Sequence, residues 1–214
     1  RLSGFNHRFD ASLGQLDMLI AAISTEFPSF NFAGSGLEEV DGSGVQYQGK
    51  RLSTILFWHL RAYLAATTYL GVPGTVIEGG GGMGELARIF HSLHPNITYT
   101  LVDLPSSLFF AEVYLGTAFP DVPISYGAEA PVEGGFWLVP ATQAELLNSK
   151  EWDLAINQGS MQEMTEEAIR FWFGRLKATA FYSLNYKETP LILDGWKVIS
   201  RVENPPSVCI TNCR

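Results

Sequence analysis

The sequence predicts an α/β fold: a doubly wound, seven-stranded and mostly parallel sheet, preceded by N-terminal helices. Two observations support this prediction. From Gly74 onward, short runs rich in β-branched residues alternate with segments whose apolar residues recur at helical spacing. Two of the strand-like runs end on a carboxylate, at Glu78 and at Asp103, and a run of glycines follows the first. Strands that alternate with helices favour parallel pairing, because the helix carries the chain back to the starting edge of the sheet.

Each element follows from its local pattern. Stripes of apolar residues predict two N-terminal helices, near 13–27 and 52–64, and Pro28 ends the first. Residues 34–49 between them are rich in Gly and Ser and are interpreted as a mobile loop. Strands are expected at 75–78, 98–103, 135–139, 153–157, 179–184, 196–202 and 207–211. We expect residues 1–70 to form a helical cap and loop that belongs to the same domain as residues 71–214.

Composition excludes several classes of function. The 214 residues are 46% hydrophobic and 17% charged, which is ordinary for a globular domain. A formal net charge of −8 argues against a nucleic-acid partner, because nucleic-acid-binding proteins carry basic patches. The chain has no apolar run of membrane-spanning length and no visible signal peptide, so membrane insertion is not expected and a cytoplasmic location is.

The glycine run between the first strand and the following helix indicates a ligand loop. Glycine lets the backbone approach a ligand closely and adopts positive φ without strain. The run satisfies two templates at once, the dinucleotide G-x-G-x-x-G and the pattern E-x-G-x-G-x-G that starts at Glu78. A carboxylate at the end of the strand would repel a pyrophosphate, whereas it would attract the ammonium group of a bound methionine moiety. Glu78 therefore favours a methyl donor over a dinucleotide.

Asp103 ends the second strand and has two interpretations. A carboxylate at this position can accept hydrogen bonds from both ribose hydroxyls of a nucleotide. It is also a favoured residue at a helix start, and Leu104-Pro-Ser follows it directly. The two roles are compatible, so Asp103 is predicted to serve in both.

Taken together, four segments resemble the class I S-adenosylmethionine-dependent methyltransferases, and within them the sugar O-methyltransferases. The segments are Val76-Ile-Glu-Gly-Gly-Gly-Gly-Met-Gly-Glu-Leu-Ala-Arg88, Leu101-Val-Asp-Leu-Pro105, Asp153-Leu-Ala-Ile-Asn-Gln-Gly-Ser-Met-Gln-Glu-Met164 and Phe181-Tyr-Ser-Leu-Asn-Tyr-Lys187. The resemblance implies a Rossmann-like sheet whose last two strands form an antiparallel hairpin. It implies S-adenosylmethionine as donor, S-adenosylhomocysteine as product, and a hydroxyl of a sugar or sugar-bearing small molecule or glycan as acceptor.

The resemblance also implies the residues of the site. The donor would contact Glu78, Gly79, Gly80, Gly82, Met83, Gly84, Asp103, Leu104, Thr142, Asn157 and Gln158. Thr142 follows the third main strand, where main-chain groups and either Thr142 or Gln143 would recognise the adenine ring. Asn157 and Gln158 would lie beside the methionine portion of the donor, and Asn185 and Tyr186 would touch the acceptor.

Two residues are candidates for the general base that removes the proton of the acceptor hydroxyl. Glu163 is placed by the resemblance to face the acceptor, but Ser160-Met-Gln-Glu163 is also a capping box, in which the glutamate only holds a helix end. His59 lies on an apolar helix stripe, where a packed core histidine is the competing interpretation. A role for a divalent metal is left open. Two alternative functions also remain: methylation of another small metabolite, and a catalytically silent donor-binding module.

Overall fold

This computed structural model describes residues 12–185, 196–203 and 206–212. The chain divides into two compact units, Arg1–Ala65 and Ala66–Arg214. None of the helices within these described ranges combines the length and apolar character that crossing a membrane requires.

The first unit contains helix α1 (Leu13–Glu26), the 3-10 turn η2 (Ala33–Ser35), the hairpin of β1 (Val45–Tyr47) and β2 (Lys50–Leu52), and most of helix α2 (Thr54–Leu70). A capping box starts α1, because Ser12 and Gln15 each accept the other's backbone N–H. The loop interpretation of residues 34–49 missed β1, as well as the burial of Leu37 and Glu39. Gln48 and Gly49 both have positive φ, which is the turn geometry that a two-residue hairpin prefers.

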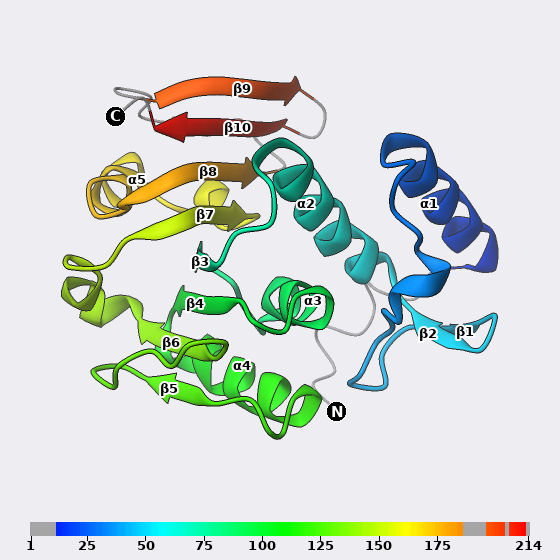
Figure 1. The fold of residues 1–214 in the computed structure, drawn as a ribbon, viewed down its shortest axis with the longest axis horizontal. Coiled ribbons are helices and arrows are strands. Elements are labelled where there is room, and N and C mark those ends of the chain that lie inside the picture. Colours follow the sequence, from blue (N-terminus) through cyan, green and yellow to red (C-terminus); the bar gives the residue numbers. More distant parts are fainter. Residues whose placement is uncertain (1–11, 186–195, 204–205, 213–214) are drawn as a thin grey trace. The chain divides into compact units, whose positions relative to one another are not determined.

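The second unit is built on an eight-stranded sheet with the order β5-β6-β4-β3-β7-β8-β10-β9 (Figure 1). All seven predicted strands are present: β3 (Thr75–Gly79), β4 (Thr98–Asp103), β6 (Phe136–Pro140), β7 (Trp152–Gln158), β8 (Ala178–Leu184), β9 (Trp196–Glu203) and β10 (Pro206–Asn212). The eighth, β5 (Ile124–Tyr126), was not predicted, since three residues are too few to show a pattern.

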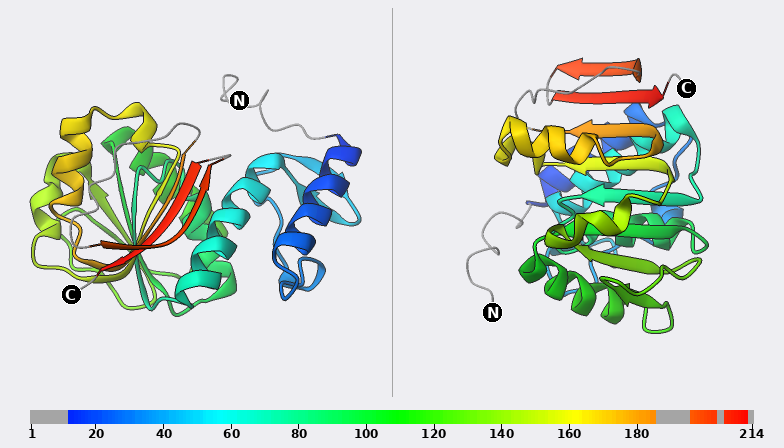
Figure 2. Two further views of the ribbon diagram at one scale, coloured as in Figure 1. Left: turned by 90° about the horizontal axis from the view of Figure 1, so that it is seen from above. Right: turned by 90° about the vertical axis from the view of Figure 1, so that its left-hand side faces the viewer.

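Pairing from β5 through β8 is parallel, and β10 runs antiparallel to both β8 and β9. The predicted C-terminal hairpin is therefore confirmed. Helix α3 (Glu85–Leu93) follows β3 and α5 (Glu166–Phe173) follows β7, and the two lie on opposite faces of the sheet (Figure 2). After β3 the chain adds strands first on one side and then, from β7, on the other. Such a switch point leaves a crevice outside the carboxyl ends of the strands, which is where ligands bind in doubly wound sheets.

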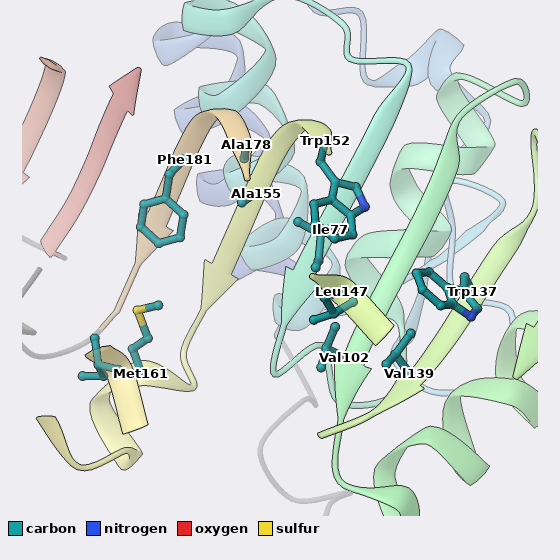
Figure 3. Close-up of a cluster of buried hydrophobic side chains, with 11 residues drawn as sticks. Ile77, Val102, Trp137, Val139, Leu147, Trp152, Ala155, Met161, Ala178 and Phe181 are labelled. Carbon is teal, nitrogen blue, oxygen red and sulfur yellow. The ribbon is translucent and has the colours of Figure 1, made fainter. Parts of the chain in front are cut away.

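A cluster of buried side chains fixes the sheet against the helices of one face (Figure 3). Strand residues of this cluster are Ile77, Val102, Trp137, Val139, Trp152, Ala155, Ala178 and Phe181. They pack against Leu147 of η3 (Ala141–Leu147), Met161 of η4 (Met161–Glu163) and Ile169 of α5. Strands β4, β6 and β8 are buried along most of their length, which is typical of strands covered on both faces.

Candidate active site

The glycine loop from Gly79 to Gly84 connects the carboxyl end of β3 to α3 at the switch point of the sheet. Gly80, Gly82 and Gly84 all have positive φ, which explains why the chain needs glycine there. Gly80 N–H donates to the carbonyl of Val102 (2.7 Å), so the loop is also tied to β4. The predicted strand-to-helix turn is thus present.

Individual glycines of the loop are needed for different reasons. A Cβ at Gly80 would lie 2.1 Å from Ser160 Oγ, and one at Gly81 would lie 2.7 Å from Glu78 Oε2. These two glycines make room for side chains of the protein itself. A Cβ at Gly79 or at Gly82 would meet no atom within 4 Å. Gly79 and Gly82 are therefore the positions where the loop backbone faces open space that a ligand can approach.

Glu78 lies beneath the loop and is almost completely buried, with 1% of its surface exposed. Loss of hydration raises the pKa of its carboxyl from 4.5 to about 7; the hydrogen bond from Tyr99 lowers it, and the nearby charge of Asp103 raises it. Tyr99 Oη donates to Glu78 Oε2 (2.8 Å). Burial also raises the pKa of the Tyr99 hydroxyl well above its usual value, so Tyr99 remains a donor at neutral pH.

Sequence reasoning did not identify Tyr99, although a signal was present. Tyr99 pairs with Val76 in the register of β3 and β4, and Glu78 pairs with Leu101. Alternation along a strand therefore puts Tyr99 on the face that carries Glu78. A tyrosine buried in a strand requires a partner for its hydroxyl, and the buried carboxylate is that partner.

Asp103 is held by two backbone amides at the carboxyl end of β4. Its Oδ2 accepts from Gly82 N–H (2.7 Å), and its Oδ1 accepts from Leu104 N–H (2.6 Å). Leu104 is the N-cap residue of α4 (Pro105–Ala118), and no side chain caps that helix, so the predicted helix-capping role of Asp103 is wrong. Each oxygen has a second lone pair, which leaves the carboxylate able to accept ribose hydroxyls as well.

Asn157 and Ser160, at the end of β7 and just after it, bind the loop from inside. Asn157 Nδ2 donates to the carbonyl of Gly79 (2.8 Å) and to Ser160 Oγ, and Ser160 Oγ donates to the same carbonyl (3.0 Å). Asn157 is 1% exposed. Its amide is thus used within the protein, beside the predicted donor site rather than open to it.

The capping box predicted between Ser160 and Glu163 is wrong. Ser160 makes no side-chain cap, because its hydroxyl is donated to the glycine loop. Glu163 closes η4 through its backbone N–H, which donates to the Ser160 carbonyl (3.0 Å), while its side chain is exposed. The true cap in this region is Thr165, which accepts from Ala168 N–H (3.2 Å) at the start of α5.

The remaining predicted site residues lie in several places. Met83 and Leu104 are exposed beside the loop, and Thr142 is exposed in η3 after β6. Gln158 is buried at the end of β7. Asn185 is buried just after β8, and Tyr186 lies outside the described residues.

His59 is half-buried in α2, within the first unit. Among the described residues, no group of three or more His, Cys, Asp or Glu side chains is arranged to hold a metal ion.

Comparison with known proteins supports the fold. No protein-family model and no curated protein sequence matches the chain. A mutant of MtNAS solved in complex with S-adenosylmethionine aligns over 73% of this chain at 13% identity, with a TM-score of 0.52, and the chain spans 62% of its length. A proposed RNA methyltransferase from Pyrococcus horikoshii aligns over 73% of this chain and 83% of its own at 13% identity, with a TM-score of 0.54.

An O-methyltransferase family protein from Burkholderia thailandensis also aligns, over 72% of this chain and 54% of its own, at 15% identity and a TM-score of 0.52. Sequence identity at this level establishes a shared fold. The chain therefore has the Rossmann-like fold of the class I methyltransferases, as the sequence predicted.

Proposed function

We propose that the protein is an S-adenosylmethionine-dependent methyltransferase that acts on a hydroxyl of a sugar or a sugar-bearing molecule. The donor assignment rests on one observation: two carboxylates lie next to a loop whose backbone has open space beside it. Glu78 and Asp103 end adjacent strands, and the loop between them leaves free space at Gly79 and Gly82. The sugar acceptor rests on the resemblance of the four segments described above.

The residues present fit this donor. Glu78 is buried beneath the loop, so it acts through its charge and not by direct contact: the charge attracts the cationic end of a methionine moiety and repels the pyrophosphate of a dinucleotide. Asp103 has free lone pairs for the ribose hydroxyls, and Thr142 lies exposed at the end of the neighbouring strand. When bound, S-adenosylmethionine supplies a methyl group that is already activated by its sulfonium centre.

The chain must then align the acceptor oxygen with that methyl carbon, exclude water and accept the hydroxyl proton. We assign the proton to the carboxylate of Glu163, which is exposed in η4 just after β7. His59 is the second candidate. We expect Glu163→Gln to lower turnover by about 10²–10⁴, the usual contribution of a general base, with donor affinity unchanged. Near-normal turnover would remove Glu163 from the mechanism.

Donor binding is tested with Gly79→Ala. Because the built Cβ meets nothing within 4 Å and φ is not positive, alanine fits the unliganded protein, but it projects into the space assigned to the donor. Titration calorimetry should show weaker binding of S-adenosylhomocysteine. Gly14→Ala in α1 is the matched control, since its Cβ also meets nothing. Binding by Gly79→Ala that equals wild type would place the donor elsewhere.

Donor class and acceptor need two further measurements. Thermal stability should rise with S-adenosylmethionine or S-adenosylhomocysteine and not with NAD or NADP, because only a ligand of the native state stabilises it. Stabilisation by NAD alone would contradict the donor assignment. A screen of nucleotide sugars and glycans with labelled donor then tests the acceptor, and transfer only to molecules without sugar would refute the sugar assignment.

A further inference from the structure

A chain of buried amides runs from the end of β8 to the glycine loop. Asn185 Nδ2 donates to Asn157 Oδ1 (3.2 Å), and Asn157 Nδ2 donates to the carbonyl of Gly79 (2.8 Å). Asn157 and Asn185 are each 1% exposed. These hydrogen bonds connect the residue after β8 to the backbone of the glycine loop.

The orientation of the Asn157 amide determines whether its nitrogen can donate to the Gly79 carbonyl. Its oxygen accepts from two donors, Asn185 Nδ2 and Met161 N–H (3.2 Å). If the amide were reversed, its nitrogen would face these donors and its oxygen would face the Gly79 carbonyl. Both contacts would then be repulsive. The two donors thus keep the Asn157 nitrogen directed at the loop.

The side-chain nitrogen of Asn185 makes a second hydrogen bond, to β8. It donates to Ser183 Oγ (2.8 Å), but none of the described residues donates to the buried Oδ1 of Asn185.

We propose that Asn185 is a positioning residue for the donor site, which acts through Asn157 to fix the Gly79 carbonyl and with it the backbone that faces the donor. The proposal rests on the proposed function for the identity of the donor. It assigns to Asn185 no contact with the donor itself.

The informative substitution is Asn185→Asp, which keeps the shape of the side chain and replaces the donor with an acceptor. The carboxylate would repel Asn157 Oδ1, whereas the Ser183 hydroxyl can turn to donate to it, so only the contact toward the loop is lost. We expect the affinity for S-adenosylhomocysteine at pH 8 to fall by about tenfold relative to wild type. At pH 5 the protonated acid can donate to Asn157 again, because burial raises the pKa of a carboxyl, and the ratio to wild type should return toward one.

Two further variants separate positioning from general damage to the structure. Ser183→Ala removes the other contact of the same nitrogen and should bind as wild type does at both pH values. Asn185→Ala removes the donor without adding a charge. It should bind more weakly than wild type at pH 5 and at pH 8 alike, and it tests the same bond if Asn185→Asp does not fold.

The outcomes distinguish the two proposals. If wild-type protein does not bind S-adenosylhomocysteine, the proposed function fails and this inference fails with it. If wild type binds and Asn185→Asp binds equally well at pH 8, only the positioning role of Asn185 is refuted. A loss in Ser183→Ala as large as that in Asn185→Asp would also refute it.

Discussion

Replacing Glu78 with glutamine should stabilise the unliganded protein at alkaline pH. The pKa of the Glu78 carboxyl rises from 4.5 to about 7 because burial removes its hydration. Between these two pH values the folded protein binds a proton that the unfolded chain releases. The contribution to stability is therefore fully present below about pH 4.5, and it is lost as the pH rises through about 7.

The size of this effect follows from the same two values. Since one pKa unit corresponds to about 1.4 kcal/mol, ionised Glu78 lowers the free energy of unfolding by about 3 kcal/mol above pH 7. Glutamine is neutral, has nearly the same shape, and can still accept the hydrogen bond from Tyr99. Glu78→Gln should therefore raise the free energy of unfolding at pH 8 by up to about 3 kcal/mol, with no gain at pH 4.5.

Urea unfolding of the ligand-free protein at pH 4.5, 6.5 and 8 measures the difference directly. Glu145→Gln is the matched control, because it removes the same charge from an exposed side chain and should give no gain that grows with pH. The reasoning is refuted if Glu78→Gln is no more stable than wild type at pH 8, or if its gain is equal at all three pH values. The same variant should bind the donor more weakly, because it lacks the charge proposed to attract the ammonium group.

Three other predictions concern stability. Gly80→Ala should unfold at lower temperature, because its Cβ would lie 2.1 Å from Ser160 Oγ and its φ is positive; a wild-type melting temperature would contradict the packing of the loop. His91 is 4% exposed and packs against Phe119 and Phe136, and burial lowers the pKa of its imidazole. The free energy of unfolding of the wild-type protein should therefore fall as the pH drops below about 6.5. In His91→Phe it should fall less over the same pH range. Asp153 Oδ2 accepts the backbone N–H groups of Gly74 (2.8 Å) and Thr75 (2.9 Å) at the start of β3. Asp153→Asn removes the charge of this acceptor and should lower the free energy of unfolding in urea by about 1–3 kcal/mol. An unchanged unfolding midpoint would contradict this prediction.

Sequence periodicity predicted the parallel strands because their interior runs are long and apolar, and it predicted that β3 and β4 end on Glu78 and Asp103. It missed β1, β2 and β5, whose three residues each are too few to show alternation. Their pairing is decided by neighbouring strands, which a local pattern does not contain.

The candidate site was likewise predicted only in part. The glycine template indicated where the loop lies, but it gave one reason for all its glycines. The structure separates Gly80, which makes room for Ser160, from Gly79, which faces open space. Ser160 was assigned to a local cap because Glu163 follows at the right spacing, yet its hydroxyl is donated to a residue 81 positions away. Tertiary hydrogen bonds of this kind compete with local capping and leave no trace in spacing.

The two hydrogen bonds that Asp103 accepts from Gly82 and Leu104 have a consequence for the entropy of binding. A flexible carboxylate loses rotamer freedom when it binds a ligand, at a cost of about 0.5–1.5 kcal/mol for an ordered side chain. Asp103 is already held in one rotamer by two backbone amides, so this freedom is lost during folding and not during binding. A ribose that binds this carboxylate therefore meets an acceptor with a fixed conformation. The conformational entropy of the Asp103 side chain should be the same before the ligand binds as after it.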